Sequence, residues 1–291
     1  MYTTTTLLAA IAQRSFMPVN QNTFTTAEIL SAADEEMRTL IVPEILKLRE
    51  EFFISYLDYT ITANESNYEV PPRSVGLQVR AVQLIDSAGN VKPLTRINVN
   101  EASTTNAGTD TWAFYLLGNQ IYPYPKPSSA IGTLRVYYPL EPSKFVETSA
   151  IGVITSINTS TNVVTCASLP SSWATGNSFD FTRIGGGQEP WAIDNVSTLV
   201  SGTSITFSAL PSDLAVGDYV SLAEETALVQ IPSAWRDILA QAVAENILRT
   251  TSQPGAERAE KTLSRMLNTA RVSFDNRTIG NPRVVCNRIW G

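Results

Sequence analysis

The segment VTCASLPSSWATGNSFDF, residues 164–181, is followed 41 residues later by the related segment ITFSALPSDLAVGDYVSL, residues 205–222. Both contain a Leu-Pro-Ser turn, an Ala-x-Gly-Asn/Asp turn and apolar residues at the same offsets. A fixed offset of this kind indicates an internal duplication, and each copy has the pattern of strands separated by two turns. The pattern predicts a small β-barrel or sandwich closed by two related halves.

The duplicated region differs in composition from the rest of the chain. Residues 149–224 are rich in Ser, Thr, Gly and β-branched residues and have a net charge of −5, whereas the remainder carries −1. We therefore expect an inserted β domain. Because neutralising nucleic-acid phosphates requires Lys or Arg, this acidic domain is not expected to bind DNA or RNA.

Helical patterns precede the inserted domain. Thr25-Thr26-Ala27-Glu28 has the form of a capping box, and the apolar spacing after it predicts a helix with Asp34-Glu35-Glu36 on its solvated side. Pro43 stands where a second helix can begin, and apolar residues continue at helical spacing through Phe52 and Tyr56. The sequence predicts an N-terminal helical hairpin or a kinked pair of helices.

A second pair of helices is expected after the inserted domain. Ser233 is a candidate N-cap of the first, which ends at Gln253-Pro254-Gly255, and the next runs from about Ala256 to Val272. The last stretch, Asp275 to Gly291, is polar with little capacity to form a core. Residues 271–291 carry a net charge of +3 and end in an Ile-Trp pair, so we expect an extended arm that orders on a partner.

Strand patterns fill the region between the helices and the inserted domain. A Gly118-Asn119 turn predicts a hairpin from Trp112 to Tyr124, and Asn98 to Asp110 is expected to be a polar loop. The other predicted strands are Tyr59–Ile61, Tyr68–Val70, Leu77–Ile85 and Leu134–Tyr138.

The fold class that follows is α+β: a helical-hairpin core with a β-rich region, an inserted small β-barrel or sandwich domain and an extended C-terminal arm. The expected parts are an N-terminal extension (1–24), a helical hairpin with the β-rich part of the body (25–148), the inserted β domain (149–224), a C-terminal helical hairpin (225–274) and the arm (275–291).

The residue inventory excludes several classes of enzyme. The chain has no histidine, so it cannot use a Ser-His-Asp, Cys-His or histidine-metal site. Cys166 and Cys286 are too far apart for a thiolate metal motif, and Gly185-Gly186-Gly187 lacks the Lys-Ser/Thr of a phosphate-binding loop. We expect no enzymatic activity, no catalytic or metal site, no cofactor, no signal peptide and no membrane span.

The order of elements resembles the head-to-tail adaptor, or connector, proteins of tailed bacteriophages. The resemblance covers roughly Thr26 to Phe145 and Ile231 to the C-terminus, but not the inserted domain. It is carried by Glu28-Ile29-Leu30-Ser31-Ala32-Ala33-Asp34-Glu35-Glu36, Ile41-Val42-Pro43, Leu48-Arg49-Glu50-Glu51-Phe52-Phe53, Tyr68-Glu69-Val70-Pro71, Leu84-Ile85-Asp86-Ser87-Ala88-Gly89-Asn90 and Trp235-Arg236-Asp237-Ile238-Leu239.

The resemblance implies a non-enzymatic subunit of a ring, most often twelve-fold, that joins the portal to the tail and lines the DNA passage. It implies as partners other copies of the chain, the portal protein, a tail or nozzle protein and passing DNA bound without sequence specificity. The location would be the neck of the virion, after synthesis in the host bacterial cytoplasm. The ring-forming helices would contribute Met37, Leu48, Phe52, Trp235, Leu239, Leu263 and Leu267, and the portal-binding arm Arg277, Arg283, Val284, Val285, Arg288, Ile289 and Trp290.

An alternative is a carbohydrate-binding or carbohydrate-active phage or surface protein that uses the β-rich domain. Trp173 and Trp191 would then stack on sugar rings, and the Tyr122-Pro123-Tyr124-Pro125 run offers a second aromatic surface. A ring seen by native mass measurement or imaging would favour the adaptor, whereas a monomer retained on a glycan array would favour this alternative.

Overall fold

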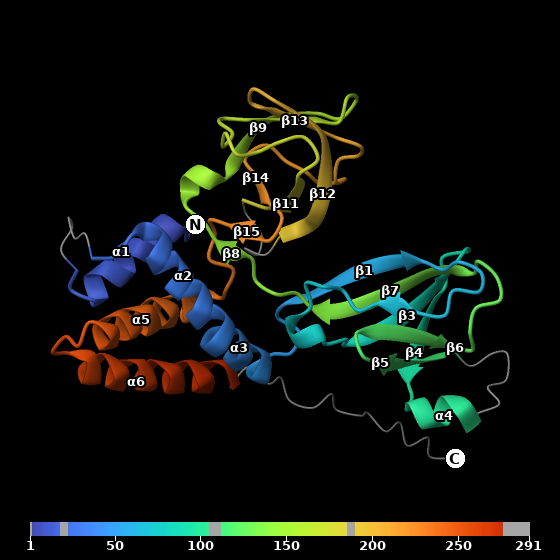
Figure 1. The fold of residues 1–291 in the computed structure, drawn as a ribbon, viewed down its shortest axis with the longest axis horizontal. Helices are drawn as coiled ribbons and strands as arrows, with labels where there is room; N and C mark the ends of the chain where they lie inside the picture. Colours follow the sequence, from blue (N-terminus) through green and yellow to red (C-terminus); the bar gives the residue numbers. More distant parts are fainter. Residues whose placement is uncertain (1, 18–22, 105–111, 185–189, 276–291) are drawn as a thin grey trace, which may run out of the picture. The chain divides into compact units, whose positions relative to one another are not determined.

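The computed structural model describes residues 2–17, 23–104, 112–184 and 190–275 of the chain, and its fold is mixed α+β (Figure 1). The chain divides into two compact units, Met1–Glu44 with Pro142–Gly291 and Ile45–Glu141. This division does not coincide with the boundaries expected from composition at residues 24, 148, 224 and 274, which stay a prediction.

The unit Ile45–Glu141 contains one seven-stranded sheet in the order β1-β7-β3-β4-β5-β6-β2. One face of the sheet covers an apolar core that includes Val82, Leu84, Leu134 and Val136, which alternate with more exposed residues along β3 and β7. The elements are β1 (Ile54–Thr60), β2 (Tyr68–Glu69), β3 (Ala81–Asp86), β4 (Val91–Arg96), α4 (Val99–Thr104), β5 (Ala113–Leu117), β6 (Gln120–Tyr124) and β7 (Gly132–Pro139).

The β3–β4 hairpin was not predicted in full, because Val91–Arg96 contains a proline and three charged or hydroxyl-bearing residues. The side chain of Asp86 forms the turn by accepting hydrogen bonds from the backbone N–H groups of Ala88 (2.9 Å) and Asn90 (2.8 Å). Gly132 begins β7 where a Cβ would lie 2.0 Å from the carbonyl oxygen of Ile85, so only glycine fits this close strand approach.

Two predictions for this unit were wrong. Phe52 lies in a turn and Tyr56 lies on β1, so the helix expected to reach them ends at Leu48. The start of the segment expected as a polar loop, Asn98 to Asp110, contains α4, whose first turn is capped because Glu101 accepts a hydrogen bond from the Asn98 N–H. Residues 105–111 lie outside the described part.

Helices from both ends of the chain build a helical body within the other unit. Helix α5 (Ser233–Thr250) contacts α1, α2 and α6, and its residues are buried on several faces. Ser233 is the first helical residue and Pro232 occupies the N-cap position, so the prediction that Ser233 caps this helix was wrong. The other helices are α1 (Thr4–Arg14), α2 (Thr26–Glu36), α3 (Val42–Leu48) and α6 (Ala256–Asp275).

The first residues of the chain pack within this body. Leu7 and Ile11 of α1 are fully buried, and the backbone N–H of Thr4 donates to the carbonyl of Ala227 (2.8 Å). Helix α1 was missed because a run of four threonines, which have low helix propensity, opens it. The hydroxyl of Thr3 caps it by accepting from the Thr6 N–H.

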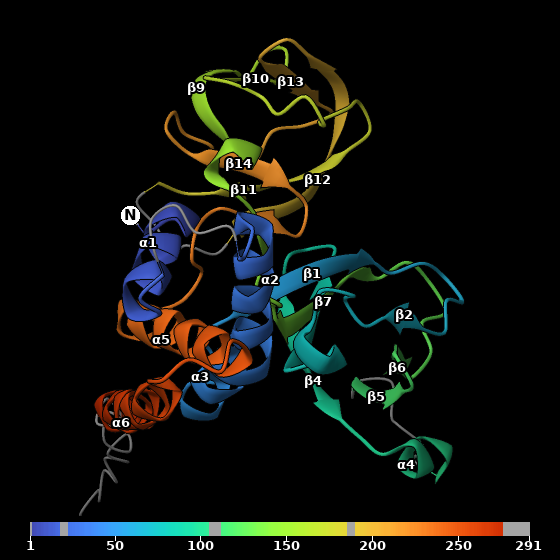
Figure 2. The same ribbon diagram turned by 60° about the vertical axis from the view of Figure 1, so that its left-hand side comes forward.

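Helices α2 and α3 form one helical run interrupted by a π-helical segment, Met37–Ile41 (Figure 2). The predicted capping box at its start is confirmed, since the Thr25 hydroxyl accepts from the Glu28 N–H and the Glu28 carboxylate accepts from the Thr25 N–H. Pro43 lacks an N–H and would clash with the carbonyl four residues earlier, and the wider π turn directly before it relieves this conflict.

The duplicated region forms a closed six-stranded barrel in the order β10-β13-β12-β11-β14-β9 (Figure 1). Phe179, Phe181, Val164, Ile205 and Val220 are fully buried inside it. The barrel contains a third strand in each repeat, β9 and β12, which the aligned sequence segments did not include. The strands are β9 (Gly152–Asn158), β10 (Val163–Cys166), β11 (Ser178–Thr182), β12 (Pro190–Ser201), β13 (Ser204–Phe207) and β14 (Tyr219–Leu222).

The two halves of the barrel repeat the same turn chemistry. Asn177 accepts a hydrogen bond from the Ala174 N–H (2.6 Å) through its side chain, and Asp218 accepts from the Ala215 N–H (3.0 Å) in the same way. A glycine with positive φ precedes each of them, Gly176 at 88° and Gly217 at 95°. A short parallel pair, β8 (Lys144–Phe145) and β15 (Glu225–Thr226), lies where the chain enters and leaves the barrel.

Candidate functional site

The predicted ring-forming residues lie in different environments. Met37, Trp235 and Leu239 lie in its core, so they stabilise the subunit and have no surface to offer a neighbour. Leu263 and Leu267 lie on α6 and are partly exposed. Leu48 is partly buried at the end of α3, and Phe52 is not on a helix at all.

The predicted portal-binding residues lie outside the described residues. The helix that leads into them, α6, ends at Asp275. These predicted residues are Arg277, Arg283, Val284, Val285, Arg288, Ile289 and Trp290.

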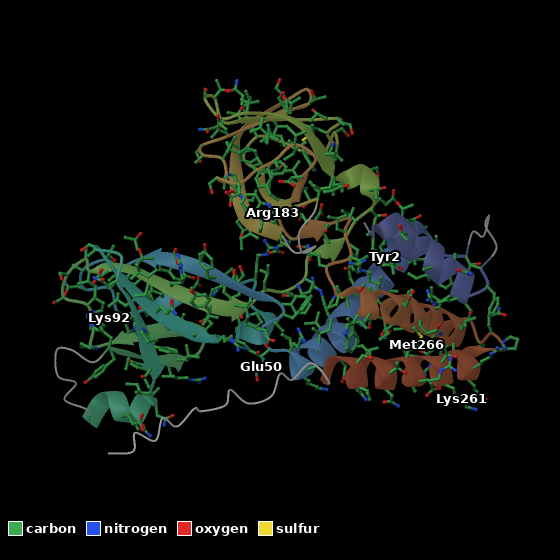
Figure 3. All side chains as sticks on the ribbon, turned by 180° about the vertical axis from the view of Figure 1, so that it is seen from behind. Tyr2, Glu50, Lys92, Arg183, Lys261 and Met266 are labelled. Carbon is green, nitrogen blue, oxygen red and sulfur yellow. The ribbon has the colours of Figure 1, made fainter. Side chains whose placement is uncertain are left out.

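Helix α6 is covered on one side by α5 and buries few of its described side chains, Ala259 and Ala270. Lys261 lies on the side of α6 away from α5 (Figure 3). Val272 is 61% exposed, and the hydroxyls of Thr262 and Thr269 donate to carbonyls of the preceding helical turn. One long face of this helix therefore has no cover within the described chain.

A groove runs beside α2 on the same helical body. It consists of two depressions of about 390 and 190 Å³ that share Phe24 and Ile247. Phe16, which is 84% exposed, borders the larger one, and Ile29 and Ala32 of α2 line the smaller one. The smaller depression is mainly apolar and is bordered by Glu28, whereas both polar and apolar residues line the larger one.

The sequence predicted that the acidic side chains of α2 are solvated, but the structure shows this for only some of them. Glu28 and Glu35 are exposed, and hydrogen bonds from Thr25 hold the pKa of Glu28 below its usual range. Asp34 instead turns inward and accepts a hydrogen bond from the Phe145 N–H (2.8 Å). Burial raises the pKa of Asp34 to about 6, and its second carboxylate oxygen has no hydrogen-bond partner among the described residues.

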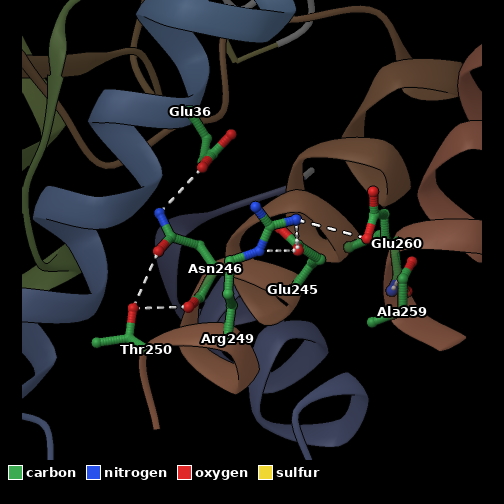
Figure 4. Close-up of polar contacts among 8 residues, drawn as sticks. Glu36, Glu245, Asn246, Arg249, Thr250, Ala259 and Glu260 are labelled. Carbon is green, nitrogen blue, oxygen red and sulfur yellow. Dashed lines mark hydrogen bonds and ion pairs between the residues drawn. The ribbon is translucent and has the colours of Figure 1, made fainter. Parts of the chain in front are cut away.

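A polar network joins α2, α5 and α6 (Figure 4). The guanidinium of Arg249 donates to the buried carboxylate of Glu245 at 2.7 Å and lies 3.6 Å from Glu260. The amide of Asn246 donates to Glu36 at 3.0 Å. Burial and the nearby Glu245 raise the pKa of Glu36, whereas its hydrogen bond from Asn246 opposes the shift. The network fixes the three helices relative to one another.

The two barrel tryptophans do not form a common surface. Trp173 is 6% exposed and packs edge-on against Phe179 in the barrel core, with ring centroids 4.9 Å apart. Trp191 is partly buried beneath the guanidinium of Arg183, which lies 4.6 Å from its ring centroid. The sugar-stacking pair expected from the sequence is therefore not displayed by this geometry.

The two buried aspartates of the barrel, Asp180 and Asp218, have structural partners. Asp180 accepts hydrogen bonds from the backbone N–H groups of Asp194 and Glu224, and Asp218 accepts from Ile184 and Ala215. Among the described residues, no three acidic or cysteine side chains lie together in a way that could hold a metal ion. Burial raises the pKa of the Cys166 thiol to about 12.

Two further features concern possible partners. Within the described ranges, no helix has both the length and the apolar character needed to cross a membrane. The triglycine segment that could be compared with a phosphate loop lies outside the described residues.

No protein-family model and no curated protein matches this chain. The helical body presents a half-covered helix and a partly apolar groove, which are surfaces of the kind that contact other proteins.

Proposed function

We propose that the chain is a structural head-to-tail adaptor of a tailed bacteriophage, without enzymatic activity. Its copies would form a ring, of twelve subunits on the family pattern, between the portal protein and the tail. The observation that carries the proposal is the helical body, in which α1 and α2 from the start of the chain pack on α5 from its end.

The helical-hairpin core of this adaptor would consist of α5 and α6. The buried face of α5 supports the subunit, and the half-covered α6 offers a long surface to the next copy. Ring assembly needs such a surface on every subunit, paired with a different surface on its neighbour. Leu263 and Leu267 are the partly exposed members of the predicted ring-forming set that lie on this helix.

The partners would be the portal protein, a tail or nozzle protein and passing DNA. The net charge of −6 disfavours tight binding to phosphates, as the lining of a DNA passage requires. The segment after α6 would dock on the portal through Arg277, Arg283 and Arg288 and the apolar residues Val284, Val285, Ile289 and Trp290. The neck of the virion would be the site of action.

The experiment that tests this proposal is native mass spectrometry and negative-stain imaging of the purified chain, alone and mixed with the portal protein of the same phage. A closed ring that binds the portal supports the adaptor. A monomer that never binds the portal would overturn it. Deleting 275–291 distinguishes the portal contact from the contacts between subunits. The deletion should abolish portal binding while circular dichroism shows an unchanged fold.

A further inference from the structure

Two outward faces of the helical body carry charges of opposite sign at the same spacing. Glu28 and Glu35 of α2 are both exposed and lie seven residues apart. Arg258 and Arg265 of α6 are also exposed and seven residues apart. Seven residues are close to two helical turns and rise about 10.5 Å, so the members of each pair lie on one face of their helix at equal separation.

The residues between the charges are small on α2 and add a positive charge on α6. On α2 they are Ser31, which is exposed, and Ala32, which lines the groove. On α6 they are Lys261, which is exposed, and Thr262, whose hydroxyl already donates to the carbonyl of Arg258 at 2.9 Å. Lys261 extends the positive face, and the small residues of α2 leave room for it at a helix contact.

These faces do not meet within one chain. Helices α2 and α6 both pack on α5, and the four charged side chains remain exposed. A second copy of the chain can supply the complementary face. Contact between two different faces is heterologous, and such contacts close into a ring when the rotation between neighbours allows it.

We propose that the α6 face of one subunit, defined by Arg258 and Arg265, docks on the α2 face of a second copy, defined by Glu28 and Glu35. The proposal rests on the ring inferred above and names the contact that builds it. Exposed ion pairs are individually weak, so the apolar groove beside Ala32 supplies contact area while the charges select the partner and fix the register.

The test uses charge reversal in the full-length chain, with native mass spectrometry at a series of protein concentrations. Arg258→Glu/Arg265→Glu should raise the concentration for half-maximal ring assembly by about tenfold or more, because like charges then face each other. Glu35→Arg should weaken assembly in the same way. Combining Glu35→Arg with one of the two reversals, Arg258→Glu or Arg265→Glu, should restore it, and the successful combination gives the relative direction of the helices.

The matched control reverses two exposed cations elsewhere, Lys92→Glu/Arg96→Glu on β4, and should assemble like the wild type. Equal loss in this control, or no rescue by either combination, would overturn the docking. So would a ring that tolerates all helix reversals but dissociates when 276–291 are deleted, since that segment would then be the occupant. If the wild-type chain forms no ring even with the portal, the proposed function itself fails.

Discussion

Val164 of β10 and Ile205 of β13 are direct cross-strand partners in the barrel, and each is the other's equivalent in the duplicated sequence. Asp180 and Ser221, also 41 residues apart, face each other across β11 and β14. Exchanging the two repeats therefore leaves the order of strands around the barrel unchanged. The barrel has an approximate two-fold axis that passes between these two pairs.

The first prediction concerns a closely packed glycine of the barrel, Gly152. A Cβ at Gly152 would lie 2.9 Å from Val220 Cγ1 and 3.0 Å from Cys166 Sγ. Gly152→Ala should therefore lower the free energy of unfolding by about 1–3 kcal/mol through overpacking. Urea unfolding measures it. The double variant Gly152→Ala/Val220→Ala should lose less free energy of unfolding than the sum of the losses in the two single variants. Strict additivity would contradict the contact. Ser156→Ala, at an exposed position, is the control.

The second prediction concerns the pH dependence of stability. The pKa of Asp34 is about 6 in the folded chain and 3.8 ordinarily, so between these values the folded state holds a proton that the unfolded state has lost. The stabilisation is present below pH 4 and is lost as pH rises through 6. Asp34→Asn keeps an acceptor for the Phe145 N–H and should flatten this decline in unfolding titrations at several pH values.

The control for that titration is Asp34→Ala, which removes the acceptor as well as the charge. It should destabilise the chain at every pH, by about 1–3 kcal/mol, because the Phe145 N–H loses its partner. An Asp34→Asn variant with the same pH slope as the wild type would show that other carboxylates cause the decline.

A third prediction addresses the polar network of the helical body. Arg249→Met removes the cation that satisfies the buried carboxylate of Glu245, and we expect a loss of about 1–3 kcal/mol in the free energy of unfolding. Arg249→Met/Glu245→Leu should recover much of this loss because no charge is then left without a partner. Thermal or urea unfolding of the two single variants and the double variant gives the coupling energy.

The fourth prediction uses the buried thiol as a reporter. Cys166 is inside the barrel and its pKa is about 12, so it should not react with a disulfide reagent at neutral pH while the barrel is closed. In a Cys286→Ser background, labelling should be slow in buffer and fast in denaturant. Rapid labelling of the native protein would mean that the barrel opens readily.

Sequence motifs predicted the structure correctly where a motif was repeated or had a defined local geometry. The duplication predicted a barrel or sandwich, and a barrel is found, because turns containing Pro and Gly recur with the apolar pattern. The capping box at Thr25 correctly placed the start of α2. The third strand of each repeat escaped prediction because Gly152–Asn158 and Pro190–Ser201 differ in length and β12 contains register shifts.

Tertiary packing accounts for the errors. Phe52 and Tyr56 continue a helical spacing in the sequence, yet the chain turns after Leu48 and Tyr56 pairs with Tyr137 across β1 and β7. The candidate site was predicted only in part for the same reason. Apolar spacing cannot distinguish Leu239, which is buried in the subunit, from Leu263, which is left partly exposed.

The π-helical segment Met37–Ile41 adds one residue to a helical turn, and each residue advances the helix by about 100°. Relative to the apolar residues before the segment, those after it consequently point in directions that a regular α-helix would not give them. Ile41, which ends the segment, and Ile45, which follows it, are both fully buried, although Pro43 lies between them. A single extra residue thus sets the angular relation between the two ends of one helix, and deletions here would rotate one apolar face away from its packing partners.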